Sequence, residues 1–290
     1  MKLRKFVSFC FTMTLFCFAS TAQTNPASPT GKLFIIGGGN RPPSLMKSLL
    51  KIAAPGAKDY VVVLPMSSEE PDTSYYYFKE DFKQVSDRPL ANFNFTPQTV
   101  NNKTWLDSLQ HARLIFITGG DQERFMKIVL NTPVYDAIHR AYQNGATIAG
   151  TSAGAAVMSR HMITGKELCD TIYEATFSRL VDKNIEIKPG LGLLTNAVVD
   201  QHFVVRSRYN RLLSALALYP SLACIGIDEE TAIIVEGNKI TVTGKGQVIV
   251  LQNPKELEIT TNKLIKFKDI EFSIYTDGDK FLIGSDKKEK

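Results

Sequence analysis

The sequence predicts an α/β fold in which a mostly parallel β-sheet is covered by helices on both faces. Short apolar segments such as 60–65 and 114–118 alternate with amphipathic stretches along the first half of the chain. Continuously apolar strands are typical of a parallel sheet buried on both faces. The hydrophobic content of 44% is ordinary for a globular core, and the length suits one large α/β domain.

The individual elements follow from the same pattern. Strands are expected at 32–36, 60–65, 93–95, 114–118 and 146–149, and helices at 44–54, 73–85 and 125–143. Beyond residue 225 the pattern changes to strands, expected at 225–227, 231–236, 239–243 and 247–251. Glu236-Gly237-Asn238 is typical of a hairpin turn, and segments 271–275 and 281–283 predict a last β-hairpin.

The first residues have the pattern of a secretory signal peptide. Lys2, Arg4 and Lys5 precede a largely apolar stretch, 6–19, which is shorter than the roughly 20 residues of a membrane span. Small residues at Ser20 and Ala22 predict cleavage before Gln23 and a secreted or periplasmic protein. The expected organisation is a signal peptide at 1–22, a linker at 23–31, a single α/β hydrolytic domain at 32–285 and a frayed tail at 286–290.

The charge of the chain indicates no nucleic-acid partner. The formal net charge is +5, but the three basic residues of the leader account for much of the excess, leaving 31 Lys and Arg against 29 Asp and Glu. No membrane association is expected after the leader is cleaved. Cys169 and Cys224 remain in a compartment that we expect to be oxidising. The sequence leaves open whether they form a disulfide with each other.

The segment Gly150-Thr151-Ser152-Ala153-Gly154 predicts a nucleophile elbow. It follows an apolar strand and precedes a helix-like run, which places Ser152 at a strand-to-helix turn. The flanking small residues permit the strained backbone that exposes the serine oxygen, and the N–H of Ala153 is a candidate oxyanion donor. A Gly- and Ser-rich turn without catalytic function is the alternative.

A serine nucleophile needs a base, and His202 is the best candidate among the four histidines. His139 falls inside a predicted amphipathic helix, whereas His111 and His161 flank other elements. His202 follows the apolar strand Ala197-Val198-Val199 at its carboxyl end, where open parallel sheets place their ligand sites.

Two acidic groups compete as the residue that orients the imidazole. Asp200 precedes His202 by two positions, and Asp228-Glu229-Glu230 follows the short strand 225–227. Glu229 is preferred because short-range geometry makes a good contact from Asp200 to the ring uncertain. Asp200 stays open as the alternative.

Two glycine-rich segments end strands at the same edge of the predicted sheet. Gly119-Gly120-Asp121-Gln122 offers a second oxyanion N–H at Gly120 and a substrate hydrogen bond from Gln122. Gly37-Gly38-Gly39-Asn40 lacks the spacing and the lysine of phosphate-binding loops, so a tight turn is the favoured interpretation. No His, Cys or Asp cluster has metal-ligand spacing, so neither a metal nor a cofactor is predicted.

Four separated motifs together resemble the cyanophycinases, a serine peptidase family that also includes dipeptidase E. They are Gly119-Gly120-Asp121-Gln122, Gly150-Thr151-Ser152-Ala153-Gly154, Asp200-Gln201-His202-Phe203 with Arg206, Arg208 and Arg211, and Gly226-Ile227-Asp228-Glu229 with Thr231-Ala232. The resemblance runs from about residue 32 to 283. It implies a fold similar to class I glutamine amidotransferases and a possible homodimer, and the leader is the one departure, because many family members are cytoplasmic.

The resemblance implies a serine exopeptidase that releases β-Asp-Arg dipeptides from cyanophycin, a poly-Asp backbone carrying Arg on its side chains. Arginines suit the carboxylates of such a substrate because the guanidinium can bind them in a bidentate way. The residues expected to bind substrate are Gln122, Asp200, Gln201, Arg206, Arg208 and Arg211. A dipeptidase E-like enzyme for other Asp-containing or isopeptide-linked peptides, and a catalytically dead binding protein, are the alternatives.

Overall fold

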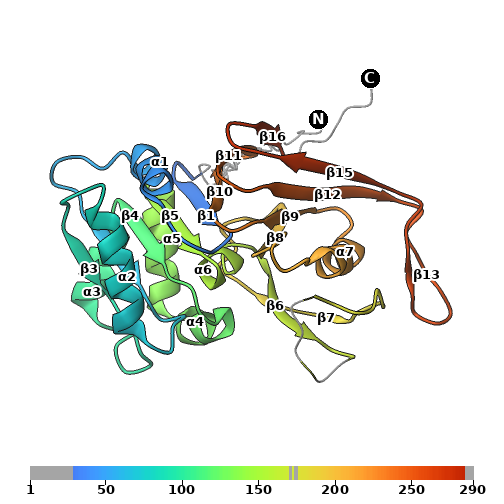
Figure 1. The fold of residues 1–290 in the computed structure, drawn as a ribbon. Coiled ribbons are helices and arrows are strands. Elements are labelled where there is room, and N and C mark those ends of the chain that lie inside the picture. Colours follow the sequence, from blue (N-terminus) through green and yellow to red (C-terminus); the bar gives the residue numbers. More distant parts are fainter. Residues whose placement is uncertain (1–28, 170–171, 173–175, 285–290) are drawn as a thin grey trace, which may run out of the picture.

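The computed structural model of the chain describes residues 29–169, 172 and 176–284. The predicted signal peptide, most of the predicted linker and the predicted tail lie outside the described residues. Within those ranges, no helix is both long enough and apolar enough to cross a membrane. Two larger β-sheets with their helices, and two small two-stranded sheets, make up the described fold (Figure 1).

The larger sheet has eight strands in the order β16-β11-β10-β1-β5-β4-β2-β3. Five strands run parallel to one another: β1 (Lys32–Ile36), β2 (Val61–Leu64), β3 (Leu90–Asn92), β4 (Leu114–Ile117) and β5 (Thr147–Thr151). Three antiparallel strands extend the sheet beyond β1: β10 (Thr231–Glu236), β11 (Lys239–Gly244) and β16 (Lys280–Leu282). The predicted mostly parallel α/β sheet is thus confirmed.

Helices cover both faces of this sheet, and alternate strand residues face each layer. Phe34 and Ile36 of β1 pack against α1 (Pro43–Ala53) and α2 (Pro71–Lys83). Leu33 and Ile35 face the opposite layer, which consists of α3 (Lys103–Gln110), α4 (Gln122–Val129), α5 (Pro133–Gln143) and α6 (Ala153–Ala156). Because both faces are buried, nearly every residue of these strands is apolar.

The single helix predicted over 125–143 is wrong, because the structure has two helices there. α4 ends at Val129, and α5 begins at Pro133. Asn131 between them has a φ of 60°, which a helix interior does not allow, and Pro133 occupies the first turn of α5, where its missing N–H costs nothing. The apolar period continues across the break because both helices pack on the same face of the sheet.

The second sheet consists of four strands from the carboxyl half of the chain, in the order β15-β12-β9-β8. Its strands are β8 (Ala197–Gln201), β9 (Ala223–Ile227), β12 (Val248–Lys255) and β15 (Asp269–Tyr275), with β8 and β9 parallel. Helix α7 (Tyr209–Leu218) packs on this sheet (Figure 1). The end of β8 meets the end of β1, since the N–H of His202 donates to the carbonyl of Gly37 over 2.7 Å.

Two small antiparallel sheets complete the described fold, and the predicted hairpin turn joins two strands of the larger sheet. β6 (His161–Glu167) pairs with β7 (Ile185–Pro189), β13 (Glu258–Ile259) with β14 (Ile265–Lys266), and β10 with β11 around Gly237 and Asn238 as predicted. The predicted last hairpin is wrong: β15 pairs with β12, whereas β16 pairs with β11 in the other sheet. β15 adds to the edge of the second sheet and β16 adds to the edge of the larger one, so the chain crosses between the two sheets at residues 276–279.

The two cysteines of the described residues, Cys169 and Cys224, do not form a disulfide. Cys169 is exposed and Cys224 is buried in β9, and both are free thiols. Burial of Cys224 raises the pKa of its thiol. The thiol of Cys224 therefore behaves as a core side chain.

Candidate active site

Ser152 occupies a nucleophile elbow between β5 and α6. Its φ of 54° and ψ of −112° place it in a strained conformation that few non-glycine residues adopt. The flanking glycines are required by close packing: a Cβ on Gly150 would lie 2.3 Å from the carbonyl oxygen of Gly154, and one on Gly154 would lie 2.3 Å from that of Ile117. The strain exposes the Ser152 hydroxyl at the carboxyl edge of the sheet.

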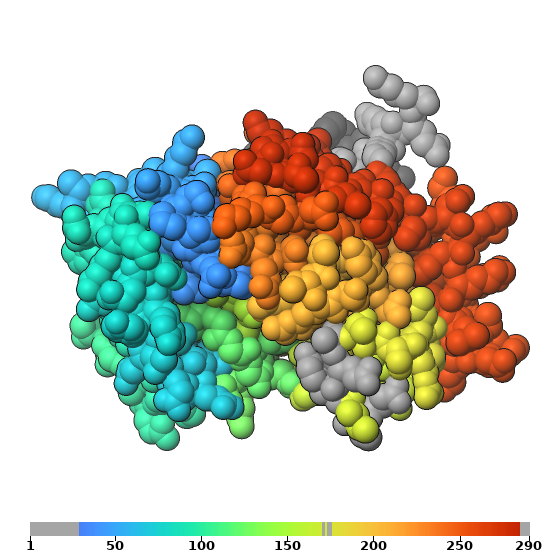
Figure 2. Space-filling model, viewed as in Figure 1, coloured from blue at the N-terminus to red at the C-terminus, as the bar shows by residue number. Residues whose placement is uncertain are grey.

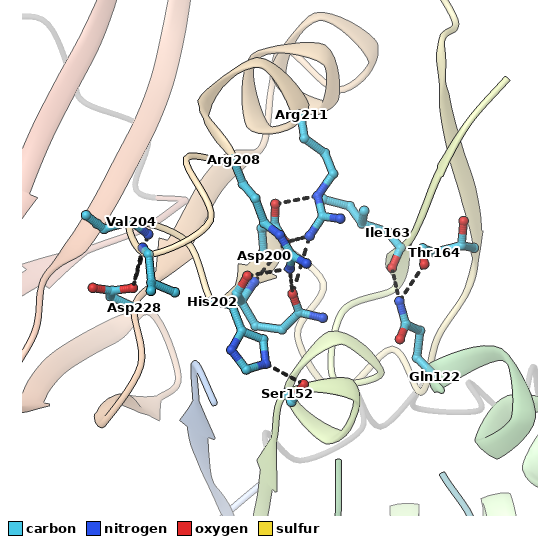
Figure 3. Close-up of polar contacts among 12 residues, drawn as sticks. Gln122, Ser152, Ile163, Thr164, Asp200, His202, Val204, Arg208, Arg211 and Asp228 are labelled. Carbon is cyan, nitrogen blue, oxygen red and sulfur yellow. Dashed lines mark hydrogen bonds and ion pairs between the residues drawn. The ribbon is translucent and has the colours of Figure 1, made fainter. Parts of the chain in front are cut away.

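His202 faces Ser152 from the second sheet. It follows β8 with a φ of 50°, and its Nε2 lies 2.8 Å from the Oγ of Ser152 (Figure 3). The other histidines are occupied elsewhere. His139 contacts the carbonyl of Leu191, and the ring of His161 stacks on Tyr219.

Glu229 completes a chain of three polar groups, since its Oε1 lies 2.6 Å from the Nδ1 of His202. Its neighbours in sequence have other partners. Asp228 accepts the N–H groups of Val204 and Val205, and Glu230 pairs with Lys245. The competing carboxylate, Asp200, contacts Arg211 instead of the imidazole.

The surroundings of His202 keep its ring neutral near neutral pH. Burial lowers the pKa of His202 below its ordinary value, while the hydrogen bond to Glu229 opposes that effect and Arg206 adds to it. A neutral imidazole with Nδ1 held by a carboxylate presents an Nε2 lone pair to the serine hydroxyl. This arrangement suits proton abstraction from Ser152.

The loop Gly37-Gly38-Gly39 lies directly against this chain of groups, which the interpretation as a tight turn missed. Gly38 has a φ of +113°, and a Cβ there would lie 2.2 Å from the Cε1 of His202. A Cβ on Gly39 would lie 2.8 Å from the Cβ of Glu229. Three consecutive glycines at the end of a strand were the sequence signal for such a close approach.

The two predicted oxyanion donors belong to the elbow itself and to the loop after β4. Ala153 is the first residue of α6, where an N–H has no partner inside the helix. Gly120 follows β4 with a φ of +137°, and its neighbour Gly119 approaches Ser152, with a Cβ position 3.4 Å from that of the serine. Their roles as oxyanion donors stay predictions.

Four of the predicted substrate-binding residues form a buried cluster beside His202 (Figure 3). Arg211 is 2% exposed and binds both carboxylate oxygens of Asp200, which is 1% exposed. Arg208 donates to the carbonyl and the side-chain oxygen of Gln201. The guanidinium groups of Arg208 and Arg211 are therefore engaged inside the protein, and substrate binding by either of them stays a prediction.

Gln122 and Arg206 lie apart from that cluster. The Nε2 of Gln122 donates to the carbonyls of Ile163 and Thr164, so this side chain ties α4 to β6 (Figure 3). Arg206 is exposed in the turn that precedes α7, and its charge contributes to the lowered pKa of His202. Direct substrate contacts by these six residues stay predictions.

A cleft of about 240 Å³ opens beside Ser152 and His202. The cleft is lined by Gly38, Gly39 and Arg41 of the loop after β1, by Phe116 and Gly119, and by residues of α2. None of the six predicted substrate-binding residues is among its lining residues. In the described part of the chain, no three His, Cys, Asp or Glu side chains are grouped as metal ligands would be.

Comparison with known proteins agrees with the motifs. The model of Peptidase family S51 matches residues 33–243. A cyanophycinase from Nostoc sp. is 31% identical over 236 residues, covering 79% of this chain and 76% of that protein. A cyanophycinase from Geminocystis herdmanii is 32% identical over 201 residues, covering 68% and 71%. The predicted resemblance is confirmed.

A solved structure shares the fold. The crystal structure of a peptidase from an acI-B1 Actinobacterium superposes with a TM-score of 0.63 and covers 88% of this chain and 97% of its own. The two sequences are 22% identical, so this likeness concerns the fold alone.

Proposed function

We propose, from the premise that the chain belongs to peptidase family S51 and is a serine-type peptidase, that it hydrolyses cyanophycin or a related Asp- and Arg-containing peptide. The observation that carries the proposal is the unbroken contact from Glu229 through His202 to Ser152 on a strained elbow. The name of the relatives that share 31–32% identity supports the choice of substrate.

In the proposed reaction, Ser152 Oγ attacks the carbonyl carbon of the scissile amide. His202 Nε2 takes the hydroxyl proton, and Glu229 stabilises the imidazolium that results. The N–H groups of Ala153 and Gly120 are proposed to hold the negative oxygen of the tetrahedral intermediate. His202 then gives the proton to the leaving amine, and water releases the acyl group by the same steps.

Two further points of the proposal concern product and location. Release of β-Asp-Arg dipeptides from a chain end would make the protein an exopeptidase, as the resemblance implies. The charged and apolar pattern of residues 1–22 supports export to the periplasm or the medium. N-terminal sequencing of the exported protein tests the proposed export and cleavage. An uncleaved chain that still begins at residue 1 and is found in a membrane fraction would contradict them.

Incubating the mature protein with cyanophycin and weighing the products by mass spectrometry tests the proposed function. Ser152→Ala and His202→Ala are each expected to lower kcat by about 10⁴- to 10⁶-fold, and the double variant no further, because the groups act as a unit. Turnover of short α-linked Asp peptides but not of the polymer would favour the dipeptidase E-like alternative. Absence of fluorophosphonate labelling at Ser152 would favour a binding protein.

A further inference from the structure

We propose that Arg41 is a specificity-determining residue of the Ser152 cleft and binds a carboxylate of the substrate. The inference rests on the proposed function and deepens it, because it assigns the group that recognises an anionic peptide. Arg41 belongs to the loop after β1 and was not singled out from the sequence. Only the structure shows that Arg41 lines the same cleft as Ser152 and His202.

The position of Arg41 is the first argument. It lines the cleft together with Ser152 and His202. It also lines an adjoining hollow of about 400 Å³, and the two hollows share Gly39, Arg41 and Tyr77. In the space-filling view, the blue surface of the loop after β1 adjoins the cyan surface of α2 (Figure 2). Arg41 thus stands where a peptide extending from Ser152 passes from one hollow to the next.

The second argument is that the side chain of Arg41 is held in place. Its Nη2 lies 2.6 Å from the Oδ2 of Asp81 in α2, and its guanidinium carbon lies 6.0 Å from the ring centre of Phe116. The backbone is restricted as well, because two prolines, Pro42 and Pro43, follow it. A group that is ordered before binding loses little conformational freedom when a ligand arrives.

The third argument is the charge of the cleft. Arg41 is the only Lys or Arg among the lining residues of the Ser152 cleft in the described structure, and that lining includes no carboxylate. Its side chain is 16% exposed, so water competes only weakly for the guanidinium. A partly buried fork of N–H donors, of which Asp81 takes one end, suits a substrate carboxylate.

Binding measurements that do not depend on catalysis test this inference. The whole protein carrying Ser152→Ala is titrated with a peptide of three β-Asp-Arg units, and with the same peptide after conversion of every carboxylate to a carboxamide. Adding Arg41→Ala should raise the Kd of the carboxylate peptide about ten- to a hundredfold and leave the Kd of the carboxamide peptide nearly the same. Arg41→Lys should restore part of the loss, because a point charge cannot reproduce the planar fork.

A matched control is Arg140→Ala, since Arg140 is exposed on α5 and lines neither hollow. This variant should bind both peptides as the Ser152→Ala protein does. An unchanged Kd for the carboxylate peptide in Arg41→Ala, or an equal loss for both peptides, overturns the inference and leaves the proposed substrate standing. If the Ser152→Ala protein with Arg41 intact binds neither peptide, the proposed substrate class is refuted, and the inference with it.

Discussion

Replacing Gly38 by alanine should displace His202 and so disable the proposed base, without removing any polar group of the site. The added Cβ would lie 2.2 Å from the Cε1 of His202, whereas carbon atoms in contact normally lie about 3.5–4 Å apart. The ring or the loop must therefore move by more than about 1 Å. A misplacement of about 1 Å costs roughly a hundredfold in rate, or about 2.7 kcal/mol in the activation barrier.

The same substitution also carries a backbone cost that must be separated from the effect on His202. Gly38 has a φ of +113°, and forcing alanine into such a conformation costs about 1–3 kcal/mol of stability. Gly237 is the matched control, because its φ is +62° and nothing lies within 4 Å of a Cβ placed there. Gly237→Ala should lower the melting temperature by a similar amount and leave kcat unchanged.

The assay is kcat on cyanophycin, with the melting temperature and circular dichroism of each variant measured in parallel. Gly38→Ala is expected to stay folded and to lose about a hundredfold in kcat. If it turned over substrate like the unmodified protein, the close approach of this loop to His202 would have no bearing on catalysis. If Gly237→Ala lost as much activity, the loss would come from backbone strain alone.

Two further predictions concern the charges around the site. Because the pKa of His202 lies below its ordinary value and the rate needs the neutral ring, the acid limb of kcat/KM should fall below about pH 6.5. Arg206→Ala should move that limb to higher pH, since a nearby positive charge is removed, and an unmoved or lower limb would contradict this account. Arg211→Met should lower the free energy of unfolding by about 3–5 kcal/mol in urea titrations, because Asp200 stays buried without the guanidinium that binds both of its oxygens, and the remaining cation, Arg208, lies 3.6 Å from Oδ1. Exposed Arg140→Met is its control, and equal effects of the two changes would show that the buried pair contributes nothing particular.

Local patterns in the sequence were sufficient for much of the fold and for the strained turn at Ser152. The period of the apolar residues identified four of the five parallel strands of the larger sheet and several of the flanking helices, because burial on both faces leaves a direct mark on composition. The strand predicted at 93–95 is wrong, because β3 is the half-buried segment Leu90–Asn92 at the edge of the sheet. The small residues around Ser152 marked the elbow, since the strained turn and the contact with Ile117 tolerate little else. The position of His202 at a strand end pointed to the correct edge of the sheet.

Side-chain direction was beyond the reach of the sequence. From the sequence, Asp200 and Glu229 are both candidates for the acid that orients His202. In the structure, Asp200 on β8 contacts Arg211 of α7, and Glu229 contacts His202. In the sequence, arginines close to the candidate base His202 look available to a ligand, but burial under a helix removes them from the surface. Arg208 and Arg211 belong to the interior for that reason.

The sequence by itself determined that a serine hydrolase site lies at the carboxyl edge of a parallel sheet, because strand periodicity and elbow chemistry are properties of neighbouring residues. The tertiary structure decided which groups surround that serine. Gly38 and Arg41 approach the site from the loop after β1, and Glu229 approaches it from the segment after β9, about 190 residues later. Their approach depends on how β1, β9 and α2 pack, and residues so far apart leave no common period in the sequence.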